Sequence, residues 1–169
     1  MPRRNVVLAT NEIYHVYNRS IAREQLFSNR LYLRKALEAM EYYRFPQRLS
    51  LSKFRQLSQK LKVQYIIESE RKSPLVEIYS FAFMPNHFHL LVKQLEDNGI
   101  SRLVTNFQNS YAKYYNLKNG RDGSLFKSQF KAKWVESDEQ YLYTSRYIHL
   151  NPVTAYIIPI EQLGLSPWT

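Results

Sequence analysis

The sequence predicts an α+β protein in which helices cover an antiparallel sheet. Short runs rich in β-branched and aromatic residues alternate with helical patterns, and two of these runs are separated only by Pro85-Asn86, a turn-forming pair. The 169 residues are enough for one domain with a substantial core. We therefore expect residues 1–169 to form a single domain, with an insertion at about residues 46–75.

The N-terminal part of the chain predicts one strand and one helix. Residues 12–19 are β-branched and aromatic with loose alternation, which favours a strand. Ser28 is a suitable cap for the helix that follows, and this helix should end near Phe45 because Pro46 restricts the residue before it. Its apolar positions follow i, i+3, i+4, i+7 spacing: Leu33, Ala36, Leu37 and Met40.

Residues 46–75 are predicted to form a basic helical insertion. Phe54, Leu57 and Leu61 recur at helical spacing, which predicts a short helix capped by Ser50 or Ser52. Its polar positions carry basic side chains: Lys53, Arg55 and Lys60. A solvated helix face and a DNA-contacting face both fit this pattern.

A hairpin is expected over residues 76–92, with Pro85-Asn86 at its turn. Alternate side chains of a strand share a face. His87 and His89 should therefore point the same way, with Phe88 pointing to the core. Neighbouring same-face residues lie about 6 to 7 Å apart at their Cα atoms, close enough for two imidazoles to bind one metal ion.

The C-terminal part predicts a helix, a strand and a final helix. Residues 99–118 carry a continuous apolar stripe that ends before Gly120, a natural C-cap. A strand is expected over 130–135, and Ser137 with Gln140 forms a capping box. The last helix should stop near Asn151 because Pro152 follows. The resulting β-α-β-β-α-β-α order is ferredoxin- or RRM-like.

The charge balance favours a polyanionic partner. Lys and Arg number 24 against 14 Asp and Glu, for a formal net charge of +10. There is no cysteine, so a metal site must use nitrogen and oxygen ligands. No apolar run approaches the ~20 residues of a membrane span, and no signal peptide is evident. We therefore expect a cytoplasmic protein.

Basic residues interleaved with aromatic ones between residues 118 and 133 fit a path for single-stranded nucleic acid. A basic edge strand without such a role is the alternative. The expected DNA contacts, which include one arginine of the final helix, are Arg121, Phe126, Lys127, Lys131, Lys133 and Arg146.

Tyr147 and Asn151 complete the candidate chemistry. They are four residues apart, so on a helix they lie on one face. A phenol beside a divalent cation that polarises a phosphate can attack phosphorus. Tyr143 is the better rival to Tyr147 as the nucleophile. Tyr111, Tyr114 and Tyr115 lie in the predicted helix over residues 99–118, and Tyr111 and Tyr114 are on its apolar stripe, which favours a place in the core. His15 and His149 are further candidates for metal ligands, or for outer-shell or structural roles.

With these motifs the chain resembles the HUH single-strand DNA endonucleases, and more narrowly the single-tyrosine transposases of the REP-associated type. The resemblance spans about residues 12–158. It rests on four motifs in order, which lie at residues 14–19, 84–92, 123–133 and 146–153.

The resemblance implies that His87 and His89 hold Mg²⁺ or Mn²⁺, with Asn151 as a third ligand. It implies that Tyr147 attacks single-stranded DNA, leaving a 5′-phosphotyrosine and a free 3′-hydroxyl. The partner would be DNA that contains a hairpin, in the bacterial cytoplasm and nucleoid, and a homodimer is possible. A catalytically inactive nucleic-acid-binding module on the same fold is the alternative, and a phosphoesterase for small substrates would leave the positive charge unused.

Overall fold

The computed structural model describes residues 7–154, in which four strands form one antiparallel sheet in the order β2-β3-β1-β4. The strands are β1 (Ile13–Arg19), β2 (Val76–Met84), β3 (His87–Gln94) and β4 (Lys131–Trp134). The predicted α+β class and antiparallel sheet are confirmed. Through β4 the chain follows the β-α-β-β-α-β order of ferredoxin-like folds.

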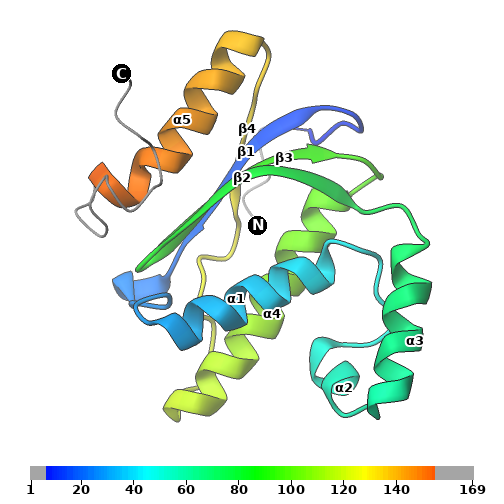
Figure 1. The fold of residues 1–169 in the computed structure, drawn as a ribbon. Coiled ribbons are helices and arrows are strands. Elements are labelled where there is room, and N and C mark those ends of the chain that lie inside the picture. The colour runs from blue at the N-terminus through cyan, green and yellow to red at the C-terminus, as the bar shows by residue number, and fades with distance from the viewer. Residues whose placement is uncertain (1–6, 155–169) are drawn as a thin grey trace, which may run out of the picture.

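Helices cover both faces of the sheet (Figure 1). Helices α1 (Arg30–Tyr43) and α4 (Gly99–Asn119) lie together on one face, and α5 (Asp138–Thr154) lies on the other. A short 3-10 turn, Ile21–Arg23, follows β1. None of the helices described is both long and apolar enough to cross a membrane.

The sheet separates a large core from a small one. The large core lies between the sheet and α1 and α4, and it buries Phe88, Leu90 and Val92 of β3 as the alternation predicted. Tyr111 of α4 is also buried there, and its hydroxyl donates to the Leu26 carbonyl at 2.5 Å. Tyr111 is therefore part of the core. The small core lies under α5 and consists of Ala82, Leu91, Val135 and Ile148.

Three predicted helix boundaries differ from the structure. Helix α1 is capped by Asn29, whose side chain accepts from the Tyr32 amide at 2.9 Å, and not by Ser28. This helix ends at Tyr43, two residues before the expected end, and Leu37 is exposed. Helix α5 runs through Pro152 to Thr154. The bias of the residue before a proline against helical φ/ψ does not end the helix here, so Pro152 lies inside its last turn.

The insertion contains two helices where one was predicted. These are α2 (Leu51–Arg55) and α3 (Gln59–Glu70). Ser50 caps α2 as expected, but Ser58 accepts from the Leu61 amide and starts a new helix. A second N-cap that satisfies the first amides of a helix is enough to separate two short helices.

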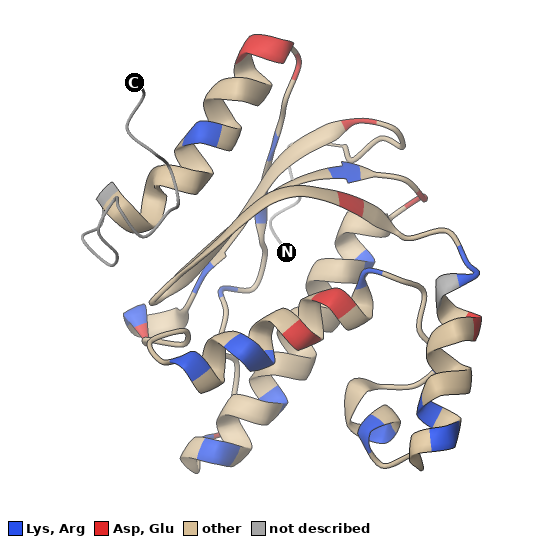
Figure 2. Ribbon diagram, in the orientation of Figure 1, with Lys and Arg blue, Asp and Glu red and all other residues tan. Residues whose placement is uncertain are grey.

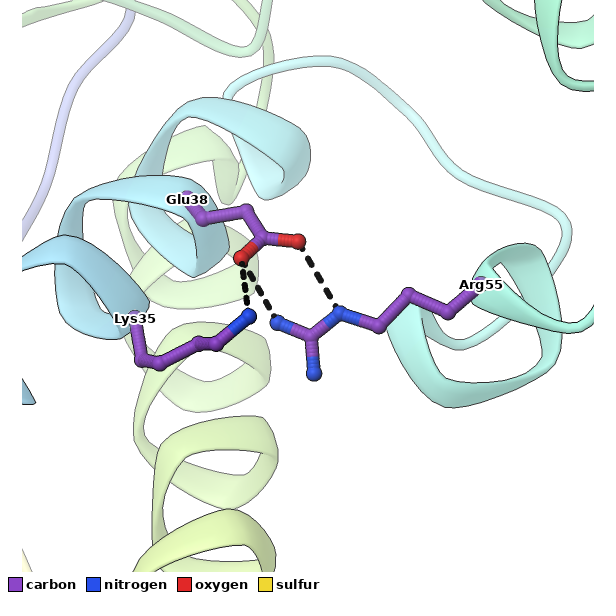
Figure 3. A network of polar contacts seen from close by, with 3 residues as sticks. All are labelled: Lys35, Glu38 and Arg55. Carbon is purple, nitrogen blue, oxygen red and sulfur yellow. Dashed lines mark hydrogen bonds and ion pairs between the residues drawn. The ribbon is translucent and has the colours of Figure 1, made fainter. Parts of the chain in front are cut away.

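An ion-pair network holds the insertion against α1 (Figure 3). Glu38 of α1 accepts from Arg55 Nε at 2.9 Å and pairs with Arg55 Nη2 at 2.8 Å, and Lys35 Nζ lies 3.0 Å from the same carboxylate. These contacts help to lower the pKa of Glu38, against the opposing effect of burial. Arg55 therefore forms an ion pair within the protein. Neither the solvated face nor the DNA-contacting face that the sequence suggested for the insertion included this contact.

We expect Gly99→Ala to destabilise the protein by about 1–3 kcal/mol. A Cβ at Gly99 would collide with the backbone carbonyl of Leu75, which accepts hydrogen bonds from Leu95 and Glu96. Chemical denaturation measures the effect. Thr105→Ala, at an exposed site of the same helix, should be neutral or slightly stabilising. Equal stability of the two variants would contradict the steric argument.

Candidate active site

The sheet face under α5 carries the candidate chemistry on three adjacent strands. On β3 it presents His87 and His89, and the antiparallel register places Arg19 opposite His87 and Tyr17 opposite His89. On β4, Lys131 lies opposite Tyr17 and Lys133 opposite His15. Because alternate residues share a face, these side chains form one polar surface while their neighbours fill the core.

The two predicted metal-ligand histidines lie side by side. Their ring centroids are 5.1 Å apart and their planes are nearly perpendicular. His87 Nδ1 lies 2.7 Å from Asn86 Oδ1, and His89 Nδ1 lies 2.8 Å from His15 Nε2. The Tyr17 ring stacks on His89 with a centroid separation of 5.6 Å. Each imidazole is thus held by a neighbour from the turn or from β1.

The histidines are kept neutral by their surroundings. Burial lowers the pKa of His89 to about 3, assisted by the neighbouring His15 and His87. Burial and Lys133 lower the pKa of His15 to about 4. Burial and Arg19 also lower the pKa of His87. A neutral imidazole has a lone pair that a metal ion can use.

Tyr147 of α5 lies over the histidines of its own chain. Its ring stands edge-on to His89 at a centroid distance of 5.6 Å and to His15 at 6.0 Å. The side chain is 44% exposed, so its phenol is accessible to a ligand. Tyr143, one turn earlier, lines the same groove but makes none of the ring contacts that the described residues show to the histidine pair.

A groove of about 610 Å³ opens between α5 and β4 around these residues. Besides His87 and His89, the groove is lined by one more imidazole, that of His15, and by four cationic side chains: Arg19, Lys127, Lys131 and Lys133. Among the described residues, no carboxylate lines it. Figure 2 shows basic positions along the segment that leads into β4. The lining residues are His15, Tyr17, Asn18, Arg19, His87, His89, Lys127, Gln129, Lys131, Lys133, Tyr143, Thr144 and Tyr147.

The donor set fits a metal ion only in part. His87 and His89 offer two nitrogen ligands, and no group of three or more His, Cys, Asp or Glu with metal-binding placement occurs among residues 7–154. Asn151 is buried on α5, one turn after Tyr147, and does not line the groove. Two imidazoles leave the other coordination positions to water and to phosphate oxygens, which hard divalent ions prefer.

The expected DNA contacts separate into two groups. Lys127, Lys131 and Lys133 line the groove, as a path for DNA requires. The other three expected contacts do not. Arg121 lies after α4 and donates to Asn116, and Arg146 is exposed on α5 outside the groove. Phe126 is buried in the large core beside Phe27 and Phe88, so its ring cannot stack on a base there.

Among the groove residues that sequence reasoning missed, Tyr17 and Arg19 had a signal in the sequence. Tyr17 and Arg19 follow His15 at intervals of two, the spacing of one face of a strand. The loose alternation of residues 12–19 predicted a strand, but it did not indicate which face of that strand would lie beside His87 and His89. The pairing of β1 with β3 explains why the same face also carries functional side chains.

Comparisons with known proteins give a family and a fold. The family model described as Transposase IS200 like matches residues 9–151. The structure of a REP-associated tyrosine transposase bound to a REP hairpin is similar with a TM-score of 0.64 at 16% identity, covering 100% of this chain and 92% of that one. A candidate transposase from Deinococcus radiodurans R1 gives a TM-score of 0.46 at 13% identity, covering 88% and 95%. No curated protein matches the chain.

The lowered pKa values predict a loss of stability in acid. The folded pKa of His15 and of His89 lies below the ordinary value of 6.5, so the unfolded chain binds more protons between about pH 3 and 6.5. We expect the free energy of unfolding to fall by about 2 kcal/mol for each of these two histidines between pH 7 and 4.5, after allowance for solvent screening and beyond the loss caused by other groups.

Denaturation at several pH values measures this slope. His89→Gln should flatten it, whereas His149→Gln, at an exposed position on α5, should leave it unchanged. Identical slopes in the two variants would show that the buried histidines do not contribute.

Proposed function

Since this chain belongs to the IS200-like transposase family, we propose that it cuts and rejoins single-stranded DNA through Tyr147, with a divalent metal ion held by His87 and His89. The supporting observation is the position of the Tyr147 ring, which stands edge-on to His89 in a groove lined by lysines. The groups that we propose as nucleophile, as metal ligands and as cations for a phosphate thus lie close together.

The proposed reaction exchanges one phosphate ester for another. The Tyr147 oxygen attacks the phosphorus, the bond from phosphorus to the 3′ oxygen breaks, and a 5′-phosphotyrosine forms. The phenol proton is balanced by the proton on the released 3′-hydroxyl. Mg²⁺ or Mn²⁺, when bound, would polarise the phosphate and stabilise the charge that develops on it. Because the ester bond is conserved, the 3′-hydroxyl can later reverse the step.

The chain's own residues would position the DNA strand. Lys131 and Lys133 project from the strand next to the histidines, and Arg19 lies opposite His87, so cations flank the place where the phosphate would sit. Such charges attract a DNA backbone without reading its sequence. The same cations repel a free metal ion, so we expect DNA to strengthen metal binding.

We further propose that Tyr147 acts on DNA bound to its own chain. Its contacts to His89 and His15 are made within one chain, so the chemistry does not require a homodimer. The similar REP-associated transposase is bound to a REP hairpin, and we propose that a hairpin-containing strand is also the partner here, in the bacterial cytoplasm and nucleoid. A binding module without catalysis would use the same groove, and the next experiment separates the two.

Tyr147→Phe should abolish a covalent DNA adduct and leave the fold intact, because only a hydroxyl is removed. The assay incubates the protein with pooled single-stranded oligonucleotides and Mn²⁺ and detects the adduct on a denaturing gel. Tyr143→Phe, one turn earlier in the same groove, is the matched control and should retain the adduct. An undiminished adduct with Tyr147→Phe would place the nucleophile elsewhere, and no adduct with any variant would favour the binding module.

Lys133→Gln should weaken binding of single-stranded DNA and reduce its salt dependence. Each phosphate contact contributes about 0.7 to the slope of log affinity against log salt for single strands, so the slope should fall by about that amount. Fluorescence anisotropy over a range of NaCl concentrations, without metal, measures it. Lys60→Gln on α3 is the control, and an equal effect there would mean that the DNA path crosses the insertion.

A further inference from the structure

Each histidine of the pair uses its Nδ1 atom to contact a neighbouring side chain. His87 Nδ1 contacts Asn86 Oδ1 at 2.7 Å, and His89 Nδ1 contacts His15 Nε2 at 2.8 Å. In both cases the remaining ring nitrogen is Nε2. The two outer partners come from different places, since Asn86 lies in the hairpin turn and His15 in β1.

The contact to Asn86 determines the tautomer of His87. An amide oxygen only accepts hydrogen bonds, so the proton must be on His87 Nδ1. Its Nε2 atom then has a free lone pair. This is the tautomer that a histidine needs in order to bind a metal ion through Nε2.

The contact between His15 and His89 allows two arrangements. Both rings are neutral, so one proton lies between Nε2 of His15 and Nδ1 of His89. If His15 donates it, His89 is protonated on Nε2 and cannot bind a metal there. If His89 donates it, His89 Nε2 is free, and both histidines of the pair offer the same nitrogen.

We propose that His15 is a positioning residue that accepts the proton of His89 Nδ1 and so keeps His89 Nε2 available for the metal ion. The inference rests on the proposed function of the histidine pair. It also assigns His15 a role other than that of third ligand, because its Nε2 atom is already occupied by His89.

The surroundings of His15 suit this role. Strand pairing places Tyr17 opposite His89, and His15 lies two residues before Tyr17 on β1, opposite Leu91. The Tyr17 ring contacts both imidazoles, with centroid distances of 5.1 Å to His15 and 5.6 Å to His89. Two rings held from two paired strands have little freedom to turn, so the hydrogen bond is preorganised before a metal ion arrives.

The test compares two neutral replacements of similar bulk. In His15→Gln the amide oxygen can accept from His89 Nδ1, whereas His15→Leu has no acceptor. Isothermal titration with Mn²⁺, in the absence of DNA, measures the metal affinity. We expect His15→Leu to weaken Mn²⁺ binding at least tenfold and His15→Gln to remain within a few-fold of the unaltered protein.

A second measurement separates positioning from folding. The ¹⁵N chemical shifts of His89 in the metal-free protein report which ring nitrogen carries the proton. We expect the Nδ1-protonated form in the unaltered protein and in His15→Gln, and a mixture or the Nε2-protonated form in His15→Leu. Asn86→Ala should shift the tautomer of His87 and leave that of His89 unchanged.

Three results would overturn the proposal. They are an Nε2-protonated His89 in the unaltered protein, equal loss of Mn²⁺ binding in the Gln and Leu variants, and unchanged Mn²⁺ binding in both. None of these measurements requires DNA cleavage. A protein that shows the tautomers and the affinities expected here but forms no adduct would retain the role of His15 and lose the proposed nuclease activity.

Discussion

The two-residue alternation of β1 and β3 is the constraint on which the structure depends. Each strand has to fill the large core with one set of side chains and build the groove with the other. Phe88 is fully buried between two histidines that share the opposite face. A shift of one residue in either strand would move the histidines into the core and the core residues into the groove, so fold and site depend on one register.

Burial is the main reason why the groove histidines are neutral. Lys133 near His15 and Arg19 near His87 add to the effect, because they disfavour a further positive charge. No carboxylate lines the groove within the described part of the chain to offset these cations. A nucleic-acid backbone, which carries phosphates in a regular array, would supply negative charge to balance these cations.

Sequence patterns predicted the strands, the long helix and the histidine face, because these depend on local alternation and capping. They failed where tertiary contacts decide. Phe126 has an aromatic ring that could stack on a base, but in the structure this ring is buried in the large core. Asn151 has the right spacing from Tyr147, but it is buried on α5 and is not among the residues that line the groove. Arg55 pairs with Glu38, 17 residues away in sequence, a contact that helical periodicity does not predict.

Helix α5 rests on the small core alone, while the rest of the chain is organised around the large one. Tyr147 is therefore carried by an element that packs on a different core from the one that joins the sheet to α1 and α4. Ile148 of α5 and Leu91 of β3 are fully buried in this small core, so a change of side-chain volume there alters how α5 packs on the sheet and, with it, where the Tyr147 ring lies.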